Sequence, residues 1–306
     1  MRAFYHDLFT FPLPEKHRFP IEKYRLVRER LLAEGILAPG DLHIPPAATD
    51  AQLTLAHTPE YIRKVTAGTL TPKEIRRIGF PWSPQLVERS RRSVGSSIAA
   101  GYAALSEGVA VNLAGGTHHA HADFGSGYCV FNDVAVAIRV LQGEGHIRRA
   151  AVVDCDVHQG DGTAAIFAAD PTVFTFSVHG AKNFPFNKPP GSLDIPLPDG
   201  TGDDEYLRAV ERGTHAALNG FAPDVVFYLA GADPFEGDTL GRLSVSKRGL
   251  EERDRLVLAA CQRAGVPLVV VMGGGYARQV QDTVDIHVTT VRLCAVWHNE
   301  TPRRER

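Results

Sequence analysis

Short apolar runs alternate with longer segments of helical spacing through the last two thirds of the chain. The apolar runs cover residues 109–114, 150–153, 172–178, 224–230 and 267–272, and the helical patterns between them cover 132–142, 163–169, 204–218 and 247–264. Such alternation predicts right-handed strand–helix–strand units, which assemble into a mainly parallel β-sheet with helices on both faces. We therefore predict a single α/β domain over residues 1–306, with its functional groups at the C-terminal edge of the strands.

The N-terminal third carries mostly helical patterns. It predicts an edge strand near residues 3–6 and helices at 20–32, 56–68 and 85–105. Two segments are predicted to be loops, 70–84 and 185–202, and the second follows a strand, which places it on the functional rim. The sequence Phe80-Pro81-Trp82 in the first loop is expected to be partly exposed.

Composition narrows the class of protein. The chain has 306 residues, 44% of them hydrophobic, which suffices for a large core. Its 33 basic and 35 acidic residues give a formal net charge of −2, so no nucleic-acid partner is expected. Four scattered cysteines, no signal-peptide pattern and no apolar run of about 18 residues predict a cytoplasmic protein without a membrane span. None of these features determines an oligomeric state.

Potential metal ligands follow two of the predicted strands. Asp156 and His158 follow the run 150–153, and Asp233 follows the run 224–230. Two carboxylates and one imidazole leave coordination positions open for water and substrate, as in catalytic metal sites. The alternative is that Asp156 and Asp233 only cap the helices that follow them.

Two adjacent histidines and one tyrosine add acid–base and hydrogen-bonding groups. His118 and His119 follow a glycine pair, and the carboxylates of Asp154 and Asp161 could each orient one imidazole for proton transfer. Tyr276 follows three glycines, and its phenol could donate a hydrogen bond to a developing oxyanion. The alternatives are packing roles for all three side chains. The nearby His121 is predicted to be a loop residue.

The motifs together resemble one family. The similarity runs from about His57 to near residue 290 and is strongest in GGTHHA, SGYCVFNDVAVAI, VVDCDVHQGDGT, AGADPFEGDTLGRLSVS and GGGY. On these motifs the sequence resembles the histone deacetylase family of the arginase–deacetylase superfamily, and most closely the class IV enzymes and their bacterial homologues. The resemblance implies the arginase–deacetylase fold.

The resemblance also implies roles for individual residues. Zinc would bind Asp156, His158 and Asp233, with Fe²⁺ as the alternative metal in the same site. His119 would act as general base and then general acid, His118 as its electrostatic partner, and Tyr276 would polarise the acyl carbonyl. Asp154 would hold His118, and Asp161 would hold His119. A structural K⁺ would contact the side chains of Asp154, Asp156 and Ser177 and the backbone oxygens of His158 and Val178. The substrate would contact Gly127, Tyr128, Phe184 and Gly274.

These assignments predict a zinc-dependent amidohydrolase that deacylates N-acylated lysine side chains through metal-activated water. One alternative is an acetylpolyamine or other small acyl-amide hydrolase, which should carry carboxylates at the rim, and residues 79–84 offer none. Another alternative is a non-catalytic module that binds acylated ligands. The presence of all the motif residues argues against it; they are His118, His119, Asp156, His158, Asp233 and Tyr276. Tyr128 stands where many relatives carry Phe, and the acidic rim residue with which many relatives hold a peptide has no clear counterpart here.

Aromatic residues in the two predicted loops suggest a groove for a long acyl chain. The apolar loop residues concerned are Phe80, Pro81, Trp82, Phe184, Pro185 and Phe186. Because each buried methylene contributes about 0.8 kcal/mol, such a groove would make kcat/KM rise from acetyl to longer acyl groups. The alternative is that the aromatic residues pack the loops onto the body of the domain.

Overall fold

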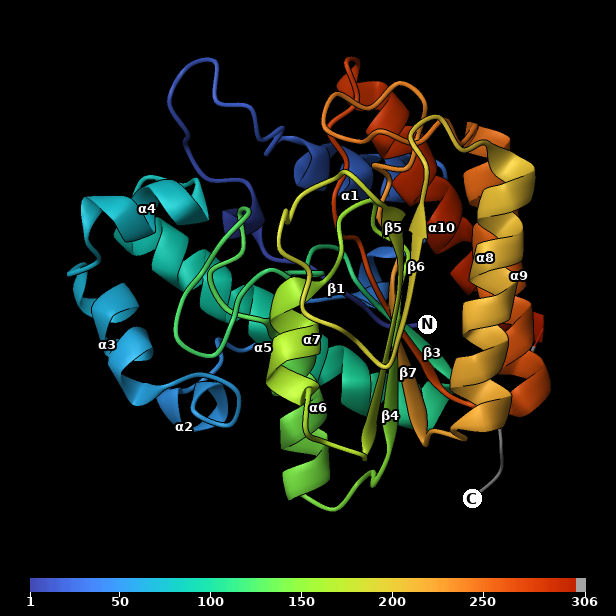
Figure 1. The fold of residues 1–306 in the computed structure, drawn as a ribbon, viewed down its shortest axis with the longest axis horizontal. Helices are drawn as coiled ribbons and strands as arrows, with labels where there is room; N and C mark the ends of the chain where they lie inside the picture. The colour runs from blue at the N-terminus through green and yellow to red at the C-terminus, as the bar shows by residue number, and fades with distance from the viewer. Residues whose placement is uncertain (301–306) are drawn as a thin grey trace.

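One parallel β-sheet forms the centre of the molecule. In a computed structural model that describes residues 1–300, eight strands lie in the order β2-β1-β3-β8-β7-β4-β5-β6, and residues 301–306 of the predicted domain lie outside the described part (Figure 1). The strands are β1 (Ala3–Phe4), β2 (Leu42–His43), β3 (Val109–Asn112), β4 (Ala150–Asp154), β5 (Val173–Gly180), β6 (Leu193–Leu197), β7 (Val225–Leu229) and β8 (Leu268–Val271). All the pairings between these strands are parallel, which confirms the predicted fold class.

The strand register joins distant parts of the chain. In β8, Leu268 pairs with Val109 of β3 on one side and with Val226 of β7 on the other. The central strands β3, β4, β7 and β8 are buried along their whole length. Burial on both faces explains why these strands are continuous apolar runs and show no alternation of polar and apolar residues.

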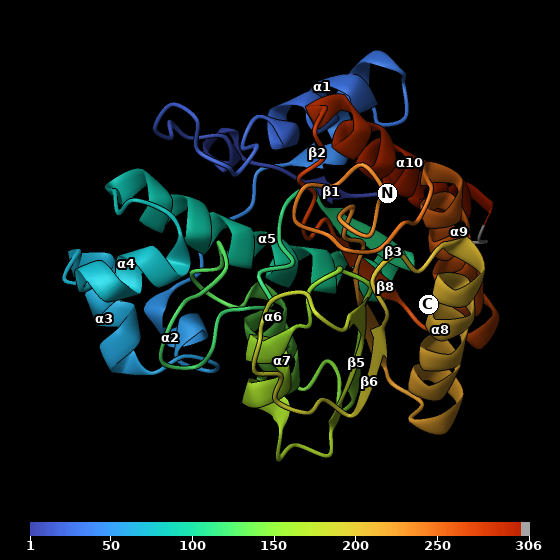
Figure 2. The same ribbon diagram turned by 45° about the horizontal axis from the view of Figure 1, so that its top comes forward.

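Helices cover both faces of the sheet. They are α1 (Lys23–Ala33), α2 (Asp50–Leu53), α3 (Pro59–Ala67), α4 (Pro72–Ile78), α5 (Pro84–Glu107), α6 (Asp133–Gly143), α7 (Asp161–Phe167), α8 (Asp203–His215), α9 (Lys247–Ala264) and α10 (Val280–Glu300). Helices α5, α6 and α7 lie on one side of the sheet, and α1, α8, α9 and α10 lie on the other (Figures 1 and 2). Within the described residues, no helix is both long enough and apolar enough to cross a bilayer.

Three segments differ from the sequence prediction. The predicted loop 70–84 contains α4, which a capping box starts: the Glu74 N–H donates to Thr71 Oγ1, and the Thr71 N–H donates to Glu74 Oε2. The predicted loop 185–202 contains the edge strand β6, whose half-exposed residues give no continuous apolar run. The C-terminal helix α10 lies in a segment for which the sequence predicted no helix or strand.

Candidate active site

The predicted site residues lie at the C-terminal ends of four adjacent strands. His118 and His119 follow β3, residues 156–161 follow β4, Asp233 follows β7, and Tyr276 follows β8. In a parallel sheet these strand ends share one edge, where α/β proteins bind their ligands. The fold therefore brings together residues that are more than 150 positions apart in the sequence.

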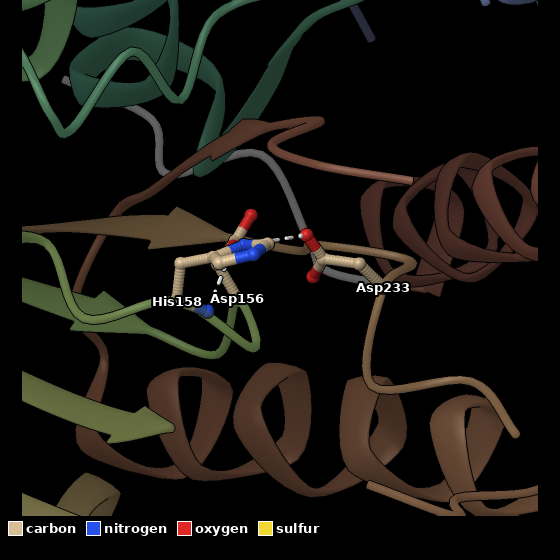
Figure 3. A group of neighbouring side chains, drawn as sticks. All are labelled: Asp156, His158 and Asp233. Carbon is tan, nitrogen blue, oxygen red and sulfur yellow. Dashed lines mark hydrogen bonds and ion pairs between the residues drawn. The ribbon is translucent and has the colours of Figure 1, made fainter. Parts of the chain in front are cut away.

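Three buried side chains form a compact group of potential metal ligands. Asp156, His158 and Asp233 converge from two strand ends (Figure 3). His158 Nδ1 lies 3.0 Å from Asp156 Oδ1 and 3.2 Å from Asp233 Oδ2. Ligand atoms at the usual bond lengths around a tetrahedral zinc ion are separated by about 3.3 Å. The two distances from His158 Nδ1 are close to this value, and the ligand atoms of all three residues lie within 4.8 Å of one another.

The surroundings of these ligands also fit a metal ion. Asp233 Oδ1 accepts a hydrogen bond from the Val157 N–H at 2.9 Å, whereas Asp233 Oδ2 is buried, lies 3.2 Å from His158 Nδ1 and forms no hydrogen bond of regular geometry. The Gly274 N–H holds Asp156 Oδ2 at 2.7 Å, and a Cβ atom at position 274 would lie 1.9 Å from Asp233 Oδ2. Glycine at 274 thus keeps open the space beside the free carboxylate oxygen.

The electrostatics of the group favour positive charge between the two carboxylates. Burial opposes the protonation of His158, but Asp156 and Asp233 outweigh it and raise the pKa of His158 to about 10. Burial and the neighbouring Asp156 raise the pKa of Asp233 to about 7. A proton on His158 or a divalent cation can each satisfy this demand, and the cation satisfies both carboxylates at once.

Each of the two adjacent histidines is held by its own carboxylate. His118 Nδ1 lies 2.7 Å from Asp154 Oδ2, and His119 Nδ1 lies 2.6 Å from Asp161 Oδ1. The two imidazole rings are 4.1 Å apart between centroids. With each Nδ1 engaged by a carboxylate, the Nε2 atoms are left for proton transfer.

Different surroundings give the two histidines different charge states. Burial disfavours the cation at both rings, but the charge of Asp154 raises the pKa of His118 to about 9. Burial and the adjacent His118 lower the pKa of His119 to about 4. At neutral pH the pair therefore combines a positively charged His118 with a neutral His119 that can accept a proton, the kind of separation that defines acid and base roles.

His121 lies in a loop, as the sequence predicted, but it also belongs to this network. Its Nε2 lies 3.1 Å from Asp161 Oδ2, and its ring stacks on Phe124 with centroids 4.2 Å apart. Asp161 therefore binds two imidazoles, and both lower its pKa against the effect of burial. The loop position of His121 is confirmed, and its contact with Asp161 is a feature that the sequence reasoning did not include; its spacing of two residues from His119 was the available signal.

Tyr276 is positioned by a carboxylate that the sequence reasoning missed. The Tyr276 N–H donates to Asp238 Oδ2 at 2.6 Å, while the side chain of Thr239 donates to the Tyr276 carbonyl oxygen at 2.8 Å. Asp238 is buried, and its Oδ1 also accepts hydrogen bonds from the backbone of Leu240 and Gly241. Burial and the nearby site carboxylates raise the pKa of Tyr276, which keeps its phenol a hydrogen-bond donor.

A second missed residue comes from the N-terminal part of the chain. Lys23 is buried, and its Nζ donates to the carbonyl oxygens of Gly273 and Gly275 at 3.3 and 3.4 Å. The same ammonium group lies 5.4 Å from the centroid of the Tyr276 ring. No local pattern could reveal this contact, because about 250 residues separate its partners.

A cavity of about 550 Å³ leads from the surface to these residues. Gly127, Tyr128 and Phe184 line it, and the Phe184 ring lies 4.9 Å from the His119 ring between centroids. A Cβ atom at position 127 would lie 2.6 Å from His119 Cδ2, so only glycine fits there. A second cavity of about 30 Å³ is lined by His118, Asp156 and Gly274 and shares His119, His158 and Tyr276 with the first.

The aromatic residues of 80–82 do not form the expected groove. Phe80 is buried and packs against Phe19 and Tyr128, with ring centroids 5.0 and 5.2 Å apart. The Trp82 indole N–H donates to the Val65 carbonyl oxygen at 2.8 Å. Phe80 and Trp82 therefore pack their segment against the body of the protein. Of the six predicted groove residues, only Phe184 and Phe186 line the cavity.

The residues predicted to bind K⁺ lie beside one another on neighbouring strands. The register of β4 and β5 pairs Asp154 with Ser177, and Val178 is the next residue of β5. Ser177 Oγ lies 3.0 Å from His179 Nδ1. The role of these residues in binding K⁺ stays a prediction.

Comparison with known proteins identifies the class. The model of the histone deacetylase domain matches residues 17–291, and the chain belongs to this family. Membership supports an acyl-amide hydrolase of the deacetylase type with a divalent-metal site, for which the buried Asp156–His158–Asp233 group is present. The assignment to class IV stays a prediction.

Individual relatives cover most of the chain. An uncharacterized protein of Picosynechococcus sp. is 47% identical over 283 residues, which span 92% of this chain and 94% of that protein. Histone deacetylase 2 of Arabidopsis thaliana is 29% identical over 294 residues, which span 92% of this chain and 76% of that protein. The crystal structure of an HDAC homolog complexed with SAHA superposes with a TM-score of 0.83 at 26% identity and covers 98% of this chain and 84% of that one.

Proposed function

We propose that this protein is a zinc-dependent deacylase that hydrolyses the amide of an N-acylated lysine side chain. The observation that carries the proposal is the meeting, at one sheet edge, of the Asp156–His158–Asp233 group with two His–Asp pairs and the Tyr276 phenol. The family and the relative solved with SAHA support it. Fe²⁺ in the same position is the alternative metal, and K⁺ beside Asp154 and Ser177 is proposed to be structural.

The chain supplies the proton transfers and the charge stabilisation. When bound, the divalent ion supplies Lewis acidity that activates both water and the amide carbonyl. Neutral His119, held by Asp161, takes the proton of the attacking water and then gives it to the leaving amine. The Tyr276 phenol donates a hydrogen bond to the carbonyl oxygen as negative charge develops there. The positive charge of His118, held by Asp154, stabilises the same developing charge.

Two other functions are less well supported. A hydrolase of acetylated polyamines would need carboxylates at the cavity mouth to hold a cationic amine, and no described lining residue of the mouth is acidic. A module that binds acylated ligands without turnover would not need a neutral base beside an oriented hydrogen-bond donor. Incubation of the purified protein with an acetyl-lysine peptide, followed by mass spectrometry, tests the proposal; an unchanged peptide at full metal loading would refute it.

The acyl group should be short. We expect an amide at the metal group to place its amine side in the cavity of about 550 Å³, which exposed residues line, and its acyl side in the cavity of about 30 Å³. That inner space holds only about two water-sized groups. We expect kcat/KM for acetyl-lysine to exceed that for octanoyl-lysine by about 10–100-fold, the usual scale for overfilling a packed interior.

A panel of peptides that differ only in acyl length measures this preference. Phe184→Ala serves as the matched control, because Phe184 lines the outer cavity and should affect all acyl lengths alike. A rise of kcat/KM with chain length would contradict the expectation and show that the acyl chain occupies the mouth.

Tyr276→Phe tests the hydrogen-bond donor. The ring and its backbone contacts to Asp238 are retained, so the metal group and the fold should not change. We expect kcat to fall by about 10²–10³-fold with little change in KM, the scale for the loss of one oxyanion donor. Steady-state kinetics at equal metal content measures the effect, and an unchanged kcat would leave Tyr276 a packing role.

A further inference from the structure

The mouth of the active-site cavity carries an excess of positive charge. Its charged lining residues, apart from the site histidines, are Arg76, Arg77, Lys182 and Arg242. All four are exposed, and none of the described lining residues is Asp or Glu. The protein as a whole has a net charge of −2, so this local excess does not follow from its composition.

Two of these cations flank the wall formed by Gly127 and Tyr128. Arg76 and Arg77 lie in the last turn of α4. The Gly127 N–H donates to the Arg77 carbonyl oxygen at 3.1 Å, and the Tyr128 N–H donates to the next carbonyl at 2.7 Å. These backbone bonds fix the end of α4 to the wall, so the main chain of Arg76 and Arg77 is held at the mouth.

The other two cations flank the wall formed by Phe184. The Arg242 N–H donates to Asn183 Oδ1 at 3.2 Å, and Asn183 Nδ2 donates to the Leu240 carbonyl oxygen at 2.8 Å. These bonds tie the loop that carries Lys182 and Phe184 to the loop that carries Arg242. Cations therefore stand on both walls of the cavity.

Carboxylates of the chain neutralise this charge only in part. Asp199 Oδ2 lies 3.7 Å from Lys182 Nζ and 3.2 Å from Arg242 Nη1, so a single carboxylate forms ion pairs with both cations. Arg76 and Arg77 form no ion pair within the described residues; the Arg77 guanidinium instead lies 4.5 Å from the Phe124 ring centroid. The C-terminal end of a helix favours cations, which accounts for the sign at α4 but not for the two loop cations.

We infer that the preferred substrate is an acyl-lysine flanked by acidic side chains. The inference rests on the proposed function and names its substrate class. When the acylated side chain occupies the cavity, the neighbouring residues of the peptide remain at the mouth, among the exposed cations. Surface cations that the chain neutralises only in part attract an anionic partner and repel a cationic one, so we expect basic peptides to bind poorly.

Matched peptides measure this preference. One acetyl-lysine peptide carries Asp and Glu on both sides, one carries Ser and Gly, and one carries Lys and Arg. We expect kcat/KM to fall in that order, with a ratio of at least about tenfold between the acidic and the basic peptide at an ionic strength of about 0.01 M. At about 1 M salt, where the screening length is only about 3 Å, the ratio should approach one.

Neutral substitutions identify the cations responsible. Two double variants remove one pair of cations each: Arg76→Gln with Arg77→Gln, and Lys182→Gln with Arg242→Gln. Each should lower the ratio of kcat/KM for the acidic peptide to kcat/KM for the basic peptide by about threefold or more. Each double variant removes two positive charges, and because Asp199 already offsets part of the charge of Lys182 and Arg242, the Arg76–Arg77 variant should have at least as large an effect. Arg208→Gln is the matched control, because this exposed arginine of α8 lies outside the cavity lining and should leave the ratio unchanged.

The possible outcomes separate this inference from the proposed function. Equal kcat/KM for the three peptides, or a ratio that no rim variant lowers, would overturn the charge preference and leave the deacylase standing. A loss of kcat/KM on all peptides with the ratio retained would likewise show that these cations do not select the substrate. Failure to hydrolyse any of the peptides would overturn the deacylase itself, and the preference with it.

Discussion

Removal of the metal should reduce deacylase activity by at least about 10³-fold, because the neutral water left behind is a far weaker nucleophile. Asp233→Asn should produce the same loss for a reason visible in the structure. The Oδ1 atom that accepts the Val157 N–H is preserved in asparagine, and only Oδ2, which lies beside His158 Nδ1, is replaced by an amide nitrogen. Backbone geometry is therefore kept while a metal ligand is lost, since a neutral amide is a poor ligand beside a carboxylate.

The measurement pairs metal analysis with kinetics. Purified wild type is treated with a chelator, assayed, and assayed again after addition of Zn²⁺ or Fe²⁺, and the metal content of Asp233→Asn is determined by mass spectrometry. Asp204→Asn, an exposed carboxylate of α8, is the control and should keep both metal and activity. Full turnover by metal-free protein would refute the mechanism, and rescue by one ion alone would identify the metal.

Replacement of His119 by alanine should lower kcat by about 10²–10⁴-fold, the range for removal of a general base. Metal content should not change, because His119 is not one of the ligands. Asp161 keeps its contact with His121 in this variant, so no buried carboxylate is left without a partner. A change confined to kcat separates this loss from unfolding or metal loss.

The neighbouring histidine provides the comparison. His118→Asn retains a side chain that can donate to Asp154 but removes the positive charge, and its effect on kcat should be smaller than that of His119→Ala. The pKa difference between the two imidazoles, about 9 against about 4, is the basis for this ranking. An inactive His118→Asn beside a nearly normal His119→Ala would reverse the two roles.

The position of the candidate site followed from local patterns, because parallel strands bring their carboxyl ends to one edge. Asp156, His158 and Asp233 could be predicted to meet for this reason alone. Lys23 and Asp238 could not be predicted, since each acts on the 273–276 loop through backbone contacts that leave no periodic signal in the sequence.

The errors in the loops have a common cause. A short helix such as α4 is specified by its capping residues Thr71 and Glu74 and not by a periodic apolar face. The burial of Phe80 and the hydrogen bond of Trp82 depend on which distant surface the segment meets, and the local sequence does not specify that surface.

The central place of β8 has a consequence for how the chain folds during synthesis. Strands β1 to β3 form one half of the sheet and β4 to β7 the other, and within the described chain only β8 is hydrogen-bonded to both halves. Before Leu268–Val271 leaves the ribosome, the inner edges of β3 and β7 are unpaired and exposed to aggregation. Because β8 joins the two halves and leads directly to Tyr276, we expect a chain that ends before β8 to lack activity.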